Sequence, residues 1–238
     1  MRSGARVGIY YAPALDDPLW RCGAEWLGRD AERDLPCKQP ALPDIAAVTA
    51  EPRGYGFHAT LKPPMRLAAD ATREALLDDV RSVAAGIPAF ALPPLAVRPI
   101  DGFLALRETE PSPELQALAD AVTAGLDRFR RPPGEAELAR RRGAGLTAAQ
   151  DANLLRWGYP YVFATWLFHL TLTRRLNEAE TALYRPAAEA WFAGALAQPR
   201  LVADVCVFVQ ADAGVPFRLA ERVPLPKARA LPSTRQRP

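Results

Sequence analysis

The sequence predicts an α+β fold, and three features of the chain lead to this prediction. Strand-like segments are interspersed with amphipathic helical segments, beginning in the order strand, helix, strand, helix, strand, strand, helix. The 238 residues, of which 49% are hydrophobic and 24% charged, suffice for one large domain or two small lobes. A short unit, His-x-Thr, also occurs in two distant segments, each of which is predicted to be a strand.

Each element of the first half has its own signal. Residues 6–12 are β-branched and aromatic and end at a proline, which predicts a first strand. Acidic residues and Pro18 then begin a helix that runs to about residue 29, with Trp20 and Trp26 expected in the core. The following segments are predicted to be a proline-rich connection with a short helix near 45–49, a strand at 55–65, a helix at 70–85, strands at 90–97 and 102–107, and a helix at 112–129.

The second half begins with a helical hairpin, which is expected as an insert at about 132–158. Its first helix ends at Gly143, and Thr147 with Gln150 forms a capping box for the second. The interval 128–142 is rich in arginine, so the hairpin is interpreted either as a lid that offers arginines to a second phosphate or as a solvated basic helix. The elements predicted here are helices at 135–142 and 148–157, a strand at 161–176, a helix at 178–197, and strands at 201–210 and 217–223.

Residues 1–226 are expected to form a single domain, followed by a basic tail at 227–238 that is predicted to be disordered. The tail accounts for the formal net charge of +3, so the rest of the chain lacks the broad basic face that a long nucleic acid requires. Three cysteines show no metal or disulfide spacing and are expected to be buried thiols. No apolar run is long enough for a membrane span or a signal peptide, so a cytoplasmic protein without a membrane partner is expected.

The two histidines of the chain, His58 and His169, each have a threonine two positions later, Thr60 and Thr171. Residues i and i+2 of a strand point to one face, so each unit places an imidazole beside a hydroxyl, with the flanking Phe and Leu on the other face. An imidazole acts as a general acid or base near neutral pH, and a hydroxyl hydrogen-bonds a phosphoryl oxygen. If the two strands face each other, the four side chains suit chemistry at a phosphorus atom.

Two other interpretations of the repeat stay open. The histidines could be half-buried strand residues, each satisfied by its neighbouring threonine. A metal site is the second alternative, but no further His, Asp or Glu stands at ligand spacing, so no metal or cofactor is expected. Three further residues are candidates for binding substrate: Lys62, on the predicted face of His58 and Thr60, together with Thr173 and Tyr10. A solvated lysine at a strand end is the alternative for Lys62.

The segments His58-Ala59-Thr60-Leu61 and His169-Leu170-Thr171-Leu172 resemble the two motifs of the 2H phosphoesterase superfamily, His-hydrophobic-Thr/Ser-hydrophobic. Relatives often carry Arg just before the Phe of the second motif, where this chain has Leu167, and Gly after the Thr-Leu-Thr run, where it has Arg174. Seven segments also look like the subfamily of domain-of-unknown-function proteins encoded in bacterial phosphonate-utilisation operons: RVGIYYAP, WLGRD, YGFHATLKPP, DGFLAL, AELARRR, WGYPYV and FHLTLT.

This resemblance implies a 2H phosphoesterase, or LigT-like, fold with two pseudo-symmetric lobes, each an antiparallel sheet with helices, around a central cleft. It also implies metal-free hydrolysis of cyclic phosphodiesters, with His58 and His169 as acid and base and with Thr60 and Thr171 on the phosphoryl oxygens. The expected partner is a small phosphorylated sugar, phosphoribosyl 1,2-cyclic phosphate from phosphonate catabolism. The alternatives are processing of RNA 2′,3′-cyclic phosphate or 2′-5′ ends, and non-catalytic binding of a phosphoryl ligand.

Overall fold

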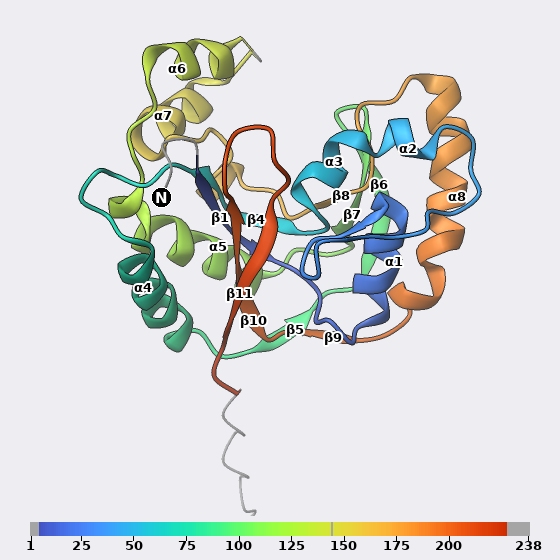
Figure 1. The fold of residues 1–238 in the computed structure, drawn as a ribbon, viewed down its shortest axis with the longest axis horizontal. Coiled ribbons are helices and arrows are strands. Elements are labelled where there is room, and N and C mark those ends of the chain that lie inside the picture. The colour runs from blue at the N-terminus through green and yellow to red at the C-terminus, as the bar shows by residue number, and fades with distance from the viewer. Residues whose placement is uncertain (1–4, 144, 228–238) are drawn as a thin grey trace, which may run out of the picture.

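A computed structural model of the chain, which describes residues 5–143 and 145–227, has an α+β fold built on one seven-stranded antiparallel sheet (Figure 1). The strand order is β11-β10-β1-β4-β8-β7-β6. These strands are β1 (Arg6–Tyr11), β4 (Ala59–Met65), β6 (Leu95–Ile100), β7 (Phe103–Glu108), β8 (Leu170–Thr171), β10 (Asp204–Gln210) and β11 (Arg218–Pro224). Two short ladders pair β2 (Arg29–Asp30) with β3 (Leu35–Pro36) and β5 (Phe90–Leu92) with β9 (Arg200–Val202). The predicted disordered tail lies outside the described residues, apart from Lys227.

The helices match most of the predicted segments, because their ends carry strong capping signals. Asp17 caps the first helix and Pro18 opens it, while Thr147 and Gln150 make the predicted capping box. Trp20 and Trp26 are buried, as predicted. The helices are α1 (Pro18–Leu27), α2 (Ile45–Val48), α3 (Ala50–Tyr55), α4 (Arg73–Ala85), α5 (Pro113–Gly125), α6 (Glu135–Arg142), α7 (Ala148–Trp157) and α8 (Glu178–Leu196), with single 3-10 turns at Asp127–Phe129 and Phe163–Thr165.

The sheet has two halves that meet at one pair of residues. Strands β11, β10, β1 and β4 form one half, and β8, β7 and β6 form the other. Ala59 of β4 and Leu170 of β8 are the residues that pair across the join. Each follows a histidine of the repeat directly, so the join brings the two motifs side by side. The α+β class with antiparallel strands is thus confirmed, and the strands of the two halves are continuous in one sheet.

The prediction of one long strand at 161–176 is wrong. Residues Phe163–Thr165 form a 3-10 turn, and only Leu170–Thr171 pair as a strand. The Thr165 hydroxyl donates to the carbonyl of Pro160 or Val162 and accepts from the Val162 amide, and such local bonds compete with strand pairing. The first motif strand is also shorter than predicted, because α3 ends at Tyr55 and β4 begins only at Ala59.

Helices cover one face of each half of the sheet (Figure 1). Helix α5 packs on β4, helix α4 contacts β10 and β11, and helix α8 packs on β6 and α1. The main core lies beneath these helices and includes Phe57, Leu61, Phe168 and Leu172, which flank the two motifs. The prediction that these four side chains point away from the histidines therefore holds. The other face carries the motifs, and a second cluster that includes Tyr10, Trp20 and Phe208 covers part of it.

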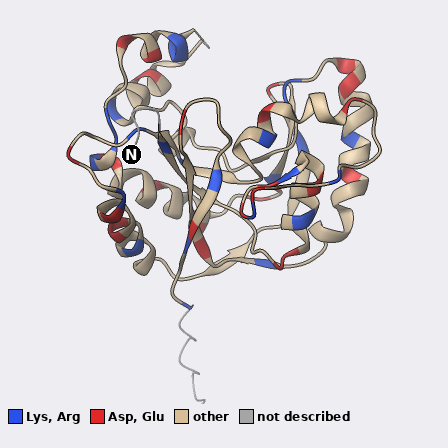
Figure 2. Cartoon of the chain, in the orientation of Figure 1, with Lys and Arg blue, Asp and Glu red and all other residues tan. Residues whose placement is uncertain are grey.

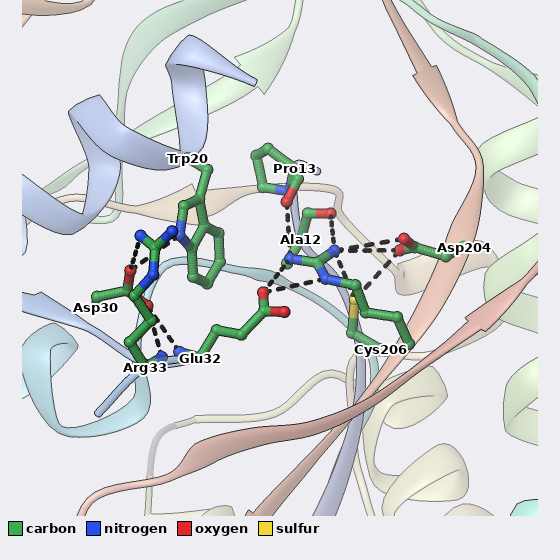
Figure 3. A network of polar contacts seen from close by, with 9 residues as sticks. Ala12, Pro13, Trp20, Asp30, Glu32, Arg33, Asp204 and Cys206 are labelled. Carbon is green, nitrogen blue, oxygen red and sulfur yellow. Dashed lines mark hydrogen bonds and ion pairs between the residues drawn. The ribbon is translucent and has the colours of Figure 1, made fainter. Parts of the chain in front are cut away.

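A polar network lies at the β11 edge of the sheet, on the face that carries the motifs (Figure 3). Arg222 of β11 donates to Glu32 at 2.8 Å and to the Pro13 carbonyl at 3.0 Å, and it lies 3.4 Å from Asp204. Together these contacts tie β10 and β11 to the chain after β1. Cys206 within the network is a buried free thiol, as predicted, whereas Cys22 and Cys37 are only partly buried. Among the described helices, none combines the length and the apolar character that crossing a membrane requires.

Candidate active site

His58 is held in one orientation by the backbone that precedes it. Helix α3 ends at Tyr55, and Gly56 then adopts a φ of 80°, which favours glycine. The Gly56 carbonyl lies 3.0 Å from His58 Nδ1, so the ring donates its Nδ1–H to this carbonyl. In the neutral ring Nε2 then carries a lone pair, and the Thr60 hydroxyl lies 3.4 Å from it.

Aromatic rings surround the imidazole of His58. The Tyr10 ring stacks on it with a centroid distance of 3.6 Å and an interplanar angle of 10°. The Tyr55 ring meets it edge-on at 5.7 Å, and Phe208 lies at 5.4 Å. A Cβ on Gly8 would come within 2.3 Å of the Tyr10 hydroxyl, so this glycine makes room for the stacked ring. Tyr10, a predicted substrate-binding residue, is 1% exposed and is placed here to position His58.

His169 repeats the same backbone contact on the other half of the sheet. Its Nδ1 lies 2.9 Å from the carbonyl of Leu167, again two residues upstream, so Nε2 is again the free nitrogen. A cavity of about 490 Å³ opens beside the ring, and Thr171 and Tyr55 also line it. The four motif residues His58, Thr60, His169 and Thr171 therefore lie around the join between the two halves.

Burial keeps both imidazoles neutral. It lowers the pKa of His58 to about 3, and a proton on the nearby His169 would act in the same direction. Burial also lowers the pKa of His169, with Arg107 as a further cause. Two neutral imidazoles with Nε2 free are two proton acceptors, and an anion bound between them would raise both pKa values. The site is therefore suited to bind an anionic group before one histidine takes up a proton.

Two residues that the sequence analysis did not single out belong to this site. Tyr55 lines the cavity beside His169 together with Thr171, and its ring meets His58 edge-on, so Tyr55 lies between the two motifs. Arg107 lies on β7, whose residue Ala105 pairs with Thr171, and this register places Arg107 across from His169. Its Nε is buried without a hydrogen-bond partner among the described residues. Arg107 thus supplies positive charge beside the second motif from the neighbouring strand. Leu167, at the position before the Phe of this motif, is uncharged.

The prediction that Lys62 shares the face of His58 and Thr60 is wrong. Tyr10 pairs with Thr60, whereas the preceding residue of β1, Ile9, pairs with Lys62, so β4 has a β-bulge at Leu61. Because side chains alternate along a strand, Lys62 shares the face of Ile9, which is the face that α5 covers.

The contacts of Lys62 and Thr173 are structural. Lys62 is 2% exposed, and its ammonium donates to the Thr123 carbonyl at 3.0 Å and to Asp127 at 3.2 Å. Thr173, the other predicted substrate-binding residue, is also buried, and its hydroxyl accepts from the Leu104 amide at 2.9 Å. Thr173 lines the cavity beside His169, but this bond holds its oxygen against β7.

Among residues 5–143 and 145–227, no three His, Cys, Asp or Glu side chains gather closely enough to hold a metal ion.

Comparison with known protein families gives a match that covers most of the helices and strands described above. Residues 60–218 match the family described as "Protein of unknown function (DUF1045)". The chain belongs to the DUF1045 family. The match begins at the threonine of the first motif and includes the whole second motif.

Two curated relatives of this DUF1045 chain carry the same name, "Ribose 1,5-bisphosphate phosphokinase PhnN". The protein of Janthinobacterium sp. (strain Marseille) is 39% identical over 231 residues, which cover 93% of this chain and 51% of that protein. The protein of Laribacter hongkongensis (strain HLHK9) is 37% identical over 221 residues, which cover 92% of this chain and 51% of that protein. The chain thus spans about half the length of the curated relatives it matches.

Solved structures show a more distant likeness. LigT of E. coli in its apo form is 13% identical, with a TM-score of 0.46 over 94% of this DUF1045 chain and 100% of that one. The complex of the same protein with 3′-AMP is 14% identical, with a TM-score of 0.45 over the same shares.

The stability of this DUF1045 chain is expected to fall in acid because of His58. The pKa of His58 is about 3 in the folded chain against 6.5 for an unperturbed His, so only the unfolded state takes up this proton as the pH falls below 6.5. The free energy of unfolding should lose about 2 kcal/mol from this residue between pH 7 and pH 5. Urea unfolding of the wild type and of His58→Asn at both pH values measures the effect. An equal loss in the two proteins would contradict it.

Proposed function

We propose that the chain is a cyclic phosphodiesterase that opens a small sugar cyclic phosphate by two-histidine acid–base catalysis, without a metal ion. One observation carries the proposal. Two imidazoles flank the join of the sheet, and each is held through Nδ1 by the carbonyl two residues upstream. Each therefore presents Nε2, with a threonine hydroxyl two residues later. A base and an acid on either side of one phosphorus atom are what in-line attack by water requires.

In the proposed reaction, one histidine accepts a proton from water through Nε2 while the water oxygen forms a bond to phosphorus. The bond from phosphorus to one sugar oxygen breaks, and the other histidine, protonated when the anionic substrate binds, donates its proton to that oxygen. The hydroxyls of Thr60 and Thr171 donate to the non-bridging oxygens as negative charge grows on them. Arg107, across from His169, adds a positive charge to the same group.

The proposed substrate is phosphoribosyl 1,2-cyclic phosphate. Breaking its phosphorus bond to O2 gives ribose 1,5-bisphosphate, the compound in the name of the two curated relatives. The chain covers about half of each relative, so a step that produces this compound complements the kinase in their name. The near-neutral body of the chain and the resemblance of both motifs to those of 2H phosphoesterases support the same proposal.

The test is incubation of the full chain with this cyclic phosphate in EDTA, with the product identified by phosphorus NMR. We expect two phosphate monoester signals, those of ribose 1,5-bisphosphate, and a rate that EDTA does not change. A sample without protein gives the background rate of hydrolysis. Absence of turnover, or turnover that depends on an added divalent metal, would contradict the proposal.

A further inference from the structure

A second cavity lies between the helical hairpin and the ends of the strands β1 and β4. It measures about 660 Å³, and six arginines line it: Arg6, Arg66, Arg130, Arg131, Arg140 and Arg141. Glu137 is the acidic residue of the described lining. Lys and Arg positions are visible on α6 and on the segment that leads into it (Figure 2). The cavity therefore carries a strong positive charge on a chain whose body is otherwise balanced.

In three of these six arginines the guanidinium group is available to bind an anion. Arg130 pairs with Asp127 at 2.9 Å, Arg141 pairs with Glu137 at 2.9 Å, and Arg6 donates to Gln210 at 2.7 Å. No carboxylate of the described residues lies within 4.0 Å of the three others, which are Arg66, Arg131 and Arg140. All three side chains are exposed. Unpaired guanidinium groups around one cavity repel one another, and an anion with several oxygens relieves this repulsion and accepts bidentate hydrogen bonds.

Strand β1 runs from the arginine cavity to the histidine site, because Arg6 lines the cavity and Tyr10 stacks on His58. Arg6 and Tyr10 are four residues apart on this strand, so they point to the same face at a separation of about 13 Å. The Tyr10 ring spans part of this distance, because it stacks on His58 and its hydroxyl lies over Gly8, toward Arg6. The end of the hairpin lies at the arginine cavity. Arg141 lies 5.1 Å from the ring of Tyr159, and Trp157 and Gly158 at the end of α7 line the cavity.

We propose that this arginine cavity binds a second phosphate group of the substrate, a terminal phosphate monoester that the reaction leaves intact. The inference rests on the proposed function for its substrate, but it concerns a different group of that substrate. A small sugar carrying a cyclic phosphate at the histidines and a phosphate monoester at the arginines spans the two sites along β1. The hairpin then acts as a selector of doubly phosphorylated substrates.

Direct binding tests the site without turnover. Isothermal titration of the full chain with ribose 5-phosphate is expected to show saturable binding, and ribose should show none. The double substitution Arg131→Gln/Arg140→Gln should weaken the binding of ribose 5-phosphate about tenfold or more, since each hydrogen bond to a charged group that is lost costs that much. Arg98→Gln is the control, because Arg98 is an exposed arginine on β6 outside the cavity. Equal affinities of the double variant and the control would overturn the inference.

Kinetics supply a second readout. We expect the ratio of kcat/KM for a ribose cyclic phosphate with the 5-phosphate to that for one without it to fall about tenfold in the double variant. If ribose 5-phosphate binds through the arginines and no cyclic phosphate is turned over, the proposed function fails while this inference stands. If the double substitution instead weakens only the binding of an RNA oligonucleotide with a cyclic phosphate end, the inference is overturned in favour of an RNA site.

Discussion

Replacing either histidine by asparagine is expected to lower kcat for the cyclic phosphate by a factor of about 100 to 10,000 while the chain stays folded. The amide of Asn in place of His58 can still donate to the Gly56 carbonyl, as Nδ1 does now, but nothing replaces Nε2. The same holds for His169 and the Leu167 carbonyl. Each variant therefore loses one proton transfer, and general acid or base catalysis contributes this much to a rate.

The measurement is the steady-state rate in EDTA, with circular dichroism and a urea unfolding curve to show that each variant is folded. We expect the double variant His58→Asn/His169→Asn to be little slower than the slower single variant, because the two residues act in one step. His58→Asn also loses part of the stacking on Tyr10, so some loss of stability is expected in that variant alone. Wild-type rates in both single variants would exclude the histidines from the chemistry.

Local signals made much of the fold and the centre of the site predictable. Asp17 with Pro18 and Thr147 with Gln150 mark helix ends through contacts that span a few residues, and such contacts are visible in a sequence. The His-x-Thr repeat can also be recognised without knowledge of strand pairing, because the spacing of two residues between imidazole and hydroxyl is a local property of the chain.

Site residues whose position depends on strand register could not be predicted from the sequence. The β-bulge at Leu61 turns Lys62 to the helical face, and a bulge is a property of the pairing between β1 and β4. Arg107 becomes part of the site because β7 pairs with β8, the strand of the second motif. No sequence pattern within β7 predicts this pairing. The 3-10 turn at Phe163–Thr165 interrupts an apolar run that strand patterns favour, because the Thr165 side chain bonds its own backbone.

Removal of the Asp127 carboxylate is expected to destabilise the fold by about 1 to 2 kcal/mol at pH 7, since it leaves the buried charge of Lys62 without its partner until the lysine loses its proton. Lys62 is 2% exposed, and only the Thr123 carbonyl would still accept from it. Its pKa is already lowered to about 8 by burial, and loss of Asp127 should lower it further. The loss in Asp127→Ala should therefore be smaller at pH 9 than at pH 7, where an unperturbed lysine is fully charged. Urea unfolding at both pH values measures this.

The matched change on the other partner, Lys62→Met, is expected to cost less than about 1.5 kcal/mol, because methionine fills a similar apolar volume. Asp127 also keeps its pair with Arg130 at 2.9 Å and lies 3.7 Å from Arg156. The two substitutions together should restore most of the stability that Asp127→Ala loses. Lys62 also lines the arginine cavity, but its ammonium donates to Thr123 and Asp127, so Lys62→Met should keep wild-type turnover. Loss of turnover in a folded Lys62→Met chain would instead place Lys62 in the phosphate site, as its spacing from His58 first suggested.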